Sequence, residues 1–272
     1  MAELVQIAIS VYRQRTHFIK KCVLSALRQS LASKTIHLRT DGHHACSAQA
    51  LKWIRRVTKQ NSEMFLVEGI RRIGIYNSYN AIFHQSESKY ILQLDADDFI
   101  HEHALDVLVE QLEGCPDAVM AFGECVEVDS IGRPIRMRNG PLHNQRKELL
   151  TDFYCFHPRL IRRTAFESVG GFSPGFDLAG DYDLCLRLNE IGAFCHVNLP
   201  LYFHRDHVKS ASRTHSYRLN EESLLAVTNA IERRSLSGQI EATSDLMTGS
   251  ITIRDKSAPP PGLFYIVPSE AD

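Results

Sequence analysis

The first 95 residues alternate between short apolar runs and segments whose apolar side chains recur with helical spacing, and this alternation constrains the fold more than any other feature. The apolar runs, which we interpret as strands, cover 5–11, 36–38, 64–67 and 90–94. The helical segments between them cover 18–27, 48–57 and 77–85. Because a strand–helix–strand order lays successive strands parallel to one another, the sequence predicts an α/β fold with a mostly parallel central sheet flanked by helices.

The regular alternation ends beyond residue 100. We expect helices at 101–112, 181–190 and 217–233, strands at 118–128 and around 193–203, and an irregular stretch from 129 to about 150. After Arg234 the composition shifts towards Ser, Thr, Gly and Pro. We therefore predict one domain over 1–235 and a C-terminal extension over 236–272, with short strands at 250–253 and 263–267. The extension is expected to be partly flexible, or docked on the domain or on a partner subunit in a homo-oligomer.

Charge and hydropathy exclude several classes of protein. Lys and Arg total 31 and Asp and Glu total 32, so no global field attracts nucleic acid, and we predict no nucleic-acid partner. No apolar stretch approaches the length of about 18 residues that a membrane span requires, and no signal peptide precedes the first strand. Peripheral association with a membrane stays compatible with the sequence.

The cysteines indicate a reducing compartment. The chain has seven cysteines, an odd number, and none of them forms a CxxC pair, which argues against a disulfide framework and a thiolate zinc site. We therefore expect a cytoplasmic protein, with the inner face of the membrane as an alternative location.

A basic stretch lies in the irregular part of the chain. Residues 133–147 hold four arginines and one lysine but no acidic residue. Two interpretations are open: a solvated loop, or a lid that attracts phosphate groups over a site.

Three carboxylates follow the strand at 90–94, in the segment YILQLDADD. Open α/β sheets bind ligands at the carboxyl ends of their strands, so Asp95, Asp97 and Asp98 stand where a ligand is expected. Acidic side chains this close repel one another unless a cation neutralises them, and carboxylate oxygens suit Mg²⁺ or Mn²⁺ bound to a substrate's phosphates. The alternative is a solvated acidic turn.

With this segment the chain resembles the inverting glycosyltransferases of family 2, which have the GT-A (Rossmann-like nucleotide-diphospho-sugar transferase) fold, over roughly residues 4–215. The resemblance implies that Tyr12 meets the nucleotide base and that Asp41, in Thr-Asp-Gly, binds the uracil of a UDP-sugar. It also covers Gly74 and Asn80, a Gly-x5-Asn signature. The residues implied in nucleotide binding are Ser10, Tyr12, Asp41, Gly74, Asn80, Asp95, Ala96, Arg205 and Ser212.

The acceptor side of that family is matched by GGF at 170–172 and by AGDYDLCLRL at 179–188. The resemblance implies that Asp181 is the catalytic base, with Asp183 as a competitor. From the residues alone, an Asp at a helix start is more commonly an N-terminal cap.

The segment from 201 to 212 resembles the family's closing motif. It implies a metal site of Asp97, Asp98 and His207, with His204 as a competitor, while Arg205 and Ser212 meet the diphosphate. An imidazole ligand favours Mn²⁺ over Mg²⁺ as the cofactor.

The strongest resemblance is to the transferase modules of bacterial chondroitin and hyaluronan polymerases, through YILQLDADD, DYDLCLRLNEIGAF and the Phe-His-Pro-Arg stretch near 156. It implies a hexosyl- or N-acetylhexosaminyltransferase that moves a sugar from a nucleotide-sugar donor to a hydroxyl of a glycan or glycolipid, in polysaccharide biosynthesis. Two alternatives stay open: a nucleotidyltransferase acting on sugar phosphates, and a non-catalytic relative that binds sugar nucleotides.

Overall fold

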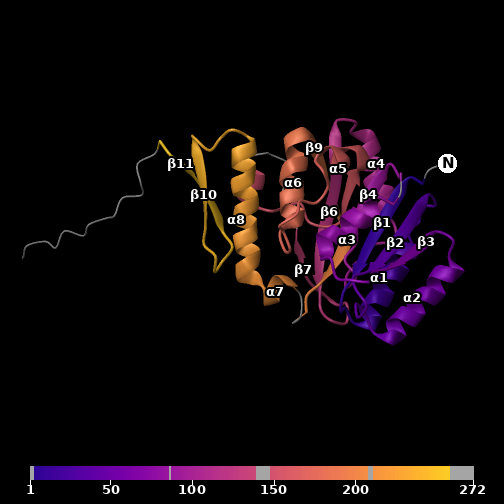
Figure 1. The fold of residues 1–272 in the computed structure, drawn as a ribbon. Coiled ribbons are helices and arrows are strands. Elements are labelled where there is room, and N and C mark those ends of the chain that lie inside the picture. Colours follow the sequence, from indigo (N-terminus) through magenta and orange to yellow (C-terminus); the bar gives the residue numbers. More distant parts are fainter. Residues whose placement is uncertain (1–2, 86, 139–147, 208–210, 258–272) are drawn as a thin grey trace, which may run out of the picture.

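The computed structural model describes residues 3–85, 87–138, 148–207 and 211–257. Its first half alternates strands and helices, as expected from the sequence (Figure 1). The strands are β1 (Val5–Val11), β2 (Lys34–Thr40), β3 (Met64–Glu68) and β4 (Tyr90–Gln93). The helices between them are α1 (Thr16–Leu27), α2 (Ala48–Gln60) and α3 (Ile75–Phe83). The predicted α/β class and the mostly parallel sheet are confirmed.

The four N-terminal strands are parallel, in the order β3-β2-β1-β4. All seven residues of β1 are buried, because helices cover both faces of the sheet and leave no side of this strand to solvent. This explains why five of the seven residues of β1 are apolar and why its two polar residues, Gln6 and Ser10, are also buried.

The second half of the sheet mixes orientations. It contains β5 (Phe99–Ile100), β6 (Ala118–Val128), β7 (Pro134–Arg138), β8 (Arg159–Arg162) and β9 (Ala193–Arg205). Strand β8 lies antiparallel between β4 and β6, while β6 runs parallel to β9. Strand β7 forms an antiparallel hairpin with β6, where the sequence predicted irregular structure. Strand β8 was also absent from the prediction.

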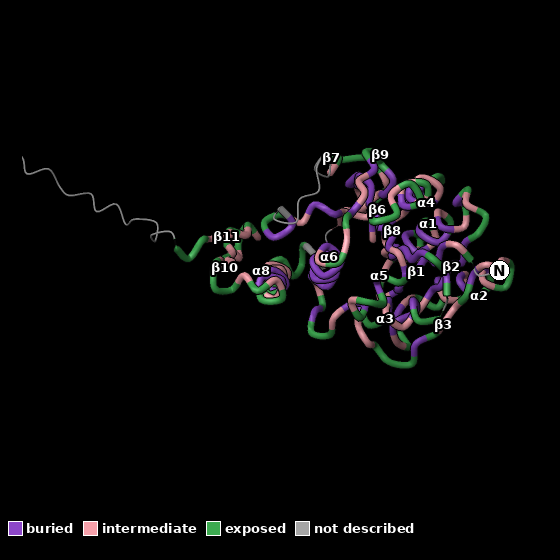
Figure 2. The backbone as a smooth tube through the Cα atoms, turned by 90° about the horizontal axis from the view of Figure 1, so that it is seen from above, coloured by how far each residue is buried: buried purple, intermediate pink, exposed green. Residues whose placement is uncertain are grey.

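The remaining helices are η1 (Glu148–Leu150), α4 (Ala104–Gly114), α5 (Arg163–Ser168), α6 (Gly180–Ile191), α7 (Ala211–Thr214) and α8 (Ser216–Arg233). Figure 1 shows α8 between α6 and a separate hairpin of β10 (Ile240–Ser244) and β11 (Ile251–Asp255). Apolar residues of α6 and α8 belong to one core cluster, and Ile240 and Ile253 of the hairpin pack against it. Figure 2 shows that α6 is mostly buried, whereas the hairpin at the end of this row carries more exposed positions.

Of the extension predicted over 236–272, the structure describes residues up to 257, so the predicted strand at 263–267 lies outside the described residues. The expected strand at 250–253 is β11, and its partner β10 was not predicted. The domain boundary at 235 stays a prediction.

Candidate active site

Acidic side chains collect where β2 and β4 end, at the carboxyl edge of the parallel sheet. Asp41 follows β2, and its backbone N–H donates to Val11 O at the end of β1 (2.9 Å). Leu94, which precedes Asp95, donates to Ala8 O of the same strand (2.9 Å). Neighbouring parallel strands therefore bring residues about 50 positions apart to one edge, as this class of sheet requires for a ligand site.

Asp95 lies in an environment that disfavours its charge. Burial, together with the neighbouring charges of Asp98 and Asp97, raises the pKa of its carboxyl group to about 6. The Tyr79 hydroxyl (2.7 Å) and the Gln93 amide (3.0 Å) both donate to Asp95 Oδ1 and oppose this rise. Burial is the largest cause of this rise and the two neighbouring carboxylates add to it, so Asp95 lies at a buried site within a cluster of acidic side chains.

The carboxylate of Asp98 is buried and forms hydrogen bonds with residues of β9. Its side chain is 2% exposed, Oδ1 accepts from the backbone N–H of Arg205 (2.7 Å), and Oδ2 accepts from the Tyr202 hydroxyl (2.8 Å). The Nδ1 atom of His204 lies 3.1 Å from the same Oδ2. Asp98 therefore joins the acidic turn to β9, and the structure does not bring its carboxylate to the other two residues predicted as metal ligands.

Those two residues, Asp97 and His207, do meet. His207 Nε2 lies 3.0 Å from Asp97 Oδ2, and both side chains are partly accessible, at 18% and 22% exposed. Within the described ranges, no group of three or more His, Cys, Asp and Glu side chains is arranged to hold a metal ion. A carboxylate and an imidazole, with Asp95 two residues before that carboxylate, fit a divalent cation that takes its other ligands from a diphosphate and water.

The side chain of Asp41 binds backbone N–H groups of the protein. Its carboxylate is buried and accepts from the N–H groups of Ile73 (2.8 Å) and Gly74 (3.0 Å), and so fixes the start of α3. Gly74 has a positive φ of 88°, a conformation that favours glycine. Beside this turn the guanidinium of Arg72 stacks on the Tyr12 ring at 4.4 Å.

Other residues predicted to bind the nucleotide also contact the protein. The Asn80 amide exchanges two hydrogen bonds of 2.9 Å with the backbone of Phe172. Arg205 is buried and donates to the carbonyl groups of Asp97 (2.8 Å), Asp129 (3.1 Å) and Ser130 (3.0 Å). Both contacts hold loops around the site.

Three predicted positions give less information. Ser10 and Ala96 are buried near the strand ends. Ser212 falls in α7, and its side chain is outside the described residues.

The predicted base, Asp181, is the second residue of α6 and is paired with a buried arginine. Arg159 Nη2 lies 2.9 Å from Asp181 Oδ2, and the two side chains are 4% and 23% exposed. Asp181 Oδ1 accepts from its neighbour's N–H at Tyr182 (2.9 Å) and lies 3.3 Å from the Tyr76 hydroxyl. A carboxylate offers about four acceptor positions, so three described donors leave capacity for a further hydrogen bond. Asp183, the competitor, is 1% exposed and paired with Arg187 (2.7 Å), which gives it a structural role.

One helix reaches both the acidic turn and the predicted base. Tyr76 and Tyr79 lie three residues apart on α3, so their side chains project from the same face of the helix. The first hydroxyl contacts Asp181 and the second contacts Asp95. The two carboxylates therefore lie close to adjacent turns of α3.

A second connection runs through β8 and β9. Arg159 Nη2 contacts His157 Nε2, the His157 ring stacks on Tyr202 (5.0 Å), and the Tyr202 hydroxyl donates to Asp98. Sequence reasoning assigned no role to Tyr76, Tyr79, His157 or Arg159. The Phe-His-Pro-Arg stretch was the available signal for the last two, but nothing local in the sequence pairs Arg159 with Asp181.

The basic stretch is largely neutralised where it is described. Arg136 and Arg138 both pair with Glu127, whose side chain is 6% exposed. Arg133 pairs with Asp129 (2.8 Å). The remainder of the stretch, 139–147, lies outside the described residues, and the part that is described resembles a structural hairpin more than a free cationic lid.

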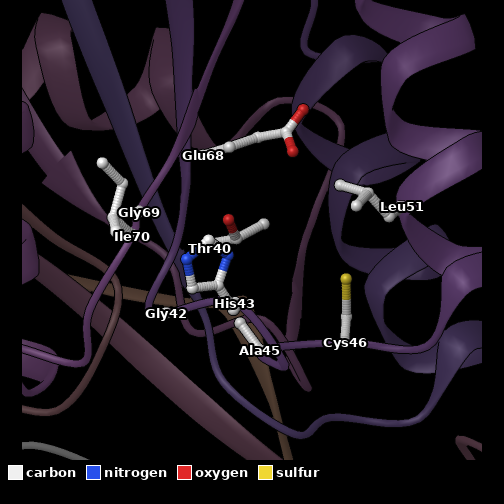
Figure 3. A pocket seen from close by; sticks show the side chains of 9 residues that line it. All are labelled: Thr40, Gly42, His43, Ala45, Cys46, Leu51, Glu68, Gly69 and Ile70. Carbon is white, nitrogen blue, oxygen red and sulfur yellow. The ribbon is translucent and has the colours of Figure 1, made fainter.

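A small cavity of about 110 Å³ lies beside the Asp41 turn, between the ends of β2 and β3 and the start of α2 (Figure 3). Its lining includes Thr40, Gly42, His43 and Glu68, which are labelled in Figure 3. None of the carboxylates after β4 or at the start of α6 lines it. The residues predicted as the metal site and the base therefore lie outside this cavity.

A curled, mostly parallel sheet with flanking helices is the architecture of the GT-A glycosyltransferases. Residues 6–170 match the model of Glycosyl transferase family 2, which is more than half of the chain, so the chain belongs to this family. This assignment removes the support for a nucleotidyltransferase.

Similar structures include that of S. aureus TarS 1-349 in complex with UDP-GlcNAc, with a TM-score of 0.66 at 13% identity over 84% of this chain and 66% of that chain. A mannosyltransferase from Pyrobaculum calidifontis in complex with GDP-Man and Mn²⁺ gives a TM-score of 0.61 at 15% identity, over 86% of this chain and 65% of that chain. Identities this low show the shared fold alone.

Curated relatives include a chondroitin synthase of Escherichia coli, 26% identical over 207 residues, which are 73% of this chain and 28% of the relative. A hyaluronan synthase of Pasteurella multocida is 26% identical over 199 residues, which are 73% of this chain and 20% of the relative. The chain thus spans about a quarter of the length of these relatives. No helix in the described ranges is both long enough and apolar enough to cross a membrane.

Proposed function

We propose that this protein is a metal-dependent, inverting glycosyltransferase that transfers a sugar from UDP to a hydroxyl group of a glycan or glycolipid. The observation that carries the proposal is the spacing set by α3, whose Tyr76 and Tyr79 contact Asp181 and Asp95 from adjacent turns. This spacing supports a candidate base close to the carboxylates that a divalent cation would join to a nucleotide diphosphate.

Asp97 and His207 are the side chains that would hold a divalent cation, with Asp95 nearby. The bound cation would supply positive charge that offsets the charge developing on the diphosphate leaving group. Asp98 supports this site indirectly, because its bonds to Tyr202 and Arg205 fix the turn that carries Asp97.

Asp181 would accept the proton of the acceptor hydroxyl. As that oxygen forms its bond to the anomeric carbon, the bond from the carbon to the UDP oxygen breaks on the opposite face, so the configuration inverts. A carboxylate is a weak base for a sugar hydroxyl, and its value rests on orientation. Arg159 and Tyr76 supply that orientation by contacting one carboxylate oxygen each.

The preference for UDP rests on the Asp41 turn and on the pair beside it, in which Arg72 is exposed and Tyr12 is half-buried. The names of the curated relatives favour a glycan acceptor, and the TarS complex with UDP-GlcNAc favours a UDP-sugar donor. Both inferences extend to this chain as part of the proposal.

Calorimetry with UDP, in Mn²⁺ and in EDTA, tests the metal requirement, and we expect binding in Mn²⁺ alone. A panel of UDP-, GDP- and dTDP-sugars, screened for metal-dependent turnover with chondroitin and hyaluronan oligosaccharides as acceptors, tests the donor class. The anomeric configuration of the product, read by NMR, tests inversion. Equal UDP affinity in EDTA would contradict the metal assignment, and preference for a GDP- or dTDP-sugar would contradict the donor assignment.

A further inference from the structure

A buried carboxylate from α8 binds the loop that leads into the predicted base. Glu222 is 7% exposed, and its Oε2 accepts from the backbone N–H groups of Asp177 (2.9 Å), Leu178 (2.7 Å) and Ala179 (3.0 Å). These three donors immediately precede α6, whose second residue is Asp181. A single carboxylate oxygen therefore holds three consecutive residues of this loop.

The residue that precedes α6 does not cap the helix with its own side chain. Ala179 is the N-terminal cap residue of α6 and offers no side-chain hydrogen bond, so the helix start depends on a group from elsewhere in the chain. Negative charge near a helix N-terminus is favourable because the helix dipole is positive there. Asp181 and Asp183 supply such charge within the first turn, and Glu222 adds to it from a helix more than 40 residues further along the chain.

A second group holds the same loop from α3. The Tyr76 hydroxyl lies 2.9 Å from Leu178 O and 3.3 Å from Asp181 Oδ1. The backbone around Leu178 is thus fixed at its N–H by Glu222 and at its carbonyl by Tyr76. Rotation of this segment would move Asp181 relative to the acidic turn.

The charge of Glu222 is itself balanced. Arg218, one turn earlier on α8, lies 3.2 Å from Glu222 Oε1 and 2.5 Å from Asp177 Oδ2. The apolar side of α8 packs with α6 through Ala226, Val227 and Ala230. Helix α8 therefore contacts both the body of α6 and the loop that begins it.

We propose that Glu222 is a positioning residue for Asp181, so that α8 takes part in transfer although it lies beyond the residues that match the family model. This inference rests on the proposed function in taking Asp181 as the base. A carboxylate that only stabilised the fold would affect donor binding and turnover together, whereas a positioning residue affects turnover alone and acts through Asp181.

The test compares Glu222→Ala and Glu222→Gln with Glu221→Ala, a control at the exposed neighbouring position on the same helix. We measure turnover of the preferred UDP-sugar with its oligosaccharide acceptor, UDP affinity in Mn²⁺, and amide hydrogen exchange of residues 173–183. We expect Glu222→Ala to lower kcat by about tenfold, with UDP affinity within about twofold and faster exchange in that segment. Glu222→Gln, which keeps an acceptor oxygen, should recover part of the rate, and Glu221→Ala should match the wild type.

The Asp181→Asn background separates the two proposals. If Glu222 acts through Asp181, Glu222→Ala should lower the residual turnover of Asp181→Asn by less than about twofold. An equal loss in both backgrounds, a matching loss of UDP affinity, or unchanged exchange in 173–183 would overturn the positioning role. Wild-type turnover in Asp181→Asn would instead contradict the proposed function, and the exchange measurement reports on the Glu222 contact in either case.

Discussion

The carboxylate of Asp181 and the guanidinium of Arg159 form an ion pair in which the charged partner of the candidate base is almost fully buried, with 2.9 Å between Nη2 and Oδ2. The same guanidinium contacts Cys155 O and His157 Nε2, so its position is fixed independently of Asp181. Burial, together with the Arg159 charge, lowers the pKa of His157 well below its ordinary value, which makes that ring a neutral acceptor for the arginine. Arg159 thus provides a rigid point against which the base is oriented.

Replacing Arg159 should reduce transfer and leave nucleotide binding intact. Arg159→Met removes the pair to Asp181, and we expect kcat to fall by about 10²-fold, within the usual range for a misplaced general base. Arg159→Lys keeps the charge but loses the planar fork of the guanidinium. Its kcat should therefore lie between that of the wild type and that of Arg159→Met. Steady-state kinetics with calorimetry of UDP in Mn²⁺ measure both quantities, and a Lys variant as active as the wild type would show that charge alone is sufficient.

Asp97 and Asp98 should respond in opposite ways to substitution. Asp97→Ala should abolish metal-dependent UDP binding and change the melting temperature little, because its carboxylate is partly exposed and contacts one imidazole. Asp98→Ala leaves the Tyr202 hydroxyl and the Arg205 N–H without their buried acceptor, and should cost about 2 kcal/mol or more of unfolding free energy. Thermal unfolding and calorimetry of both variants make the comparison. A stable Asp98→Ala protein that has lost only metal binding would make Asp98 a ligand.

The four parallel strands were predictable because each contains apolar residues, such as Ile7, Ala8 and Ile9 in β1, and because segments with helical spacing separate them. Strand β8 was not predictable in this way, because Arg159 and Arg162 are its two ends and leave only two apolar residues between them. Both arginines are accommodated inside the protein through long-range hydrogen bonds: Arg162 donates to Ala118 O (2.6 Å) and Leu112 O (2.7 Å). Such partners are distant in sequence and leave no local signal.

The candidate site likewise contains residues that the sequence indicated and residues that it did not. The carboxylates at 95–98 and at 181 follow strand and helix boundaries that a sequence pattern reveals. The groups that orient them, Tyr76, Arg159 and Glu222, act across separations of 22 residues or more, which only the packing of the chain defines.

The arginines of the β6–β7 hairpin should affect stability more than acceptor affinity. Arg136→Ser with Arg138→Ser leaves the nearly buried Glu127 without these two partners, and we expect a loss of unfolding free energy. Adding Glu127→Gln should recover much of that loss. Chemical denaturation of the double and triple variants measures it. A stable double variant whose acceptor KM rises more at low than at high salt would instead favour a lid that attracts an anionic acceptor.

Gly180 should not tolerate a side chain. A Cβ atom there would lie 2.6 Å from Tyr76 Cδ2, which is too close for two carbon atoms. The hydroxyl of the same tyrosine contacts Asp181. Gly180→Ala should therefore displace either the Tyr76 ring or the start of α6. We expect it to lower the free energy of unfolding by about 1–3 kcal/mol, the usual cost of overpacking, and to lower kcat because Asp181 is the next residue. Gly114→Ala is the control, because nothing lies within 4 Å of that position. Full activity in Gly180→Ala would show that Tyr76 can move without disturbing the base.

The most direct test of the central claim is the turnover of a UDP-sugar by Asp181→Asn, measured beside its affinity for UDP in Mn²⁺. The substitution keeps the size of the side chain but removes its ability to take the proton from the hydroxyl group of the acceptor sugar. The account predicts that turnover falls by about 10²–10⁴-fold while UDP affinity stays within about twofold of the wild type. Turnover close to that of the wild type, or a loss of UDP affinity as large as the loss of turnover, would contradict the assignment of Asp181 as the base.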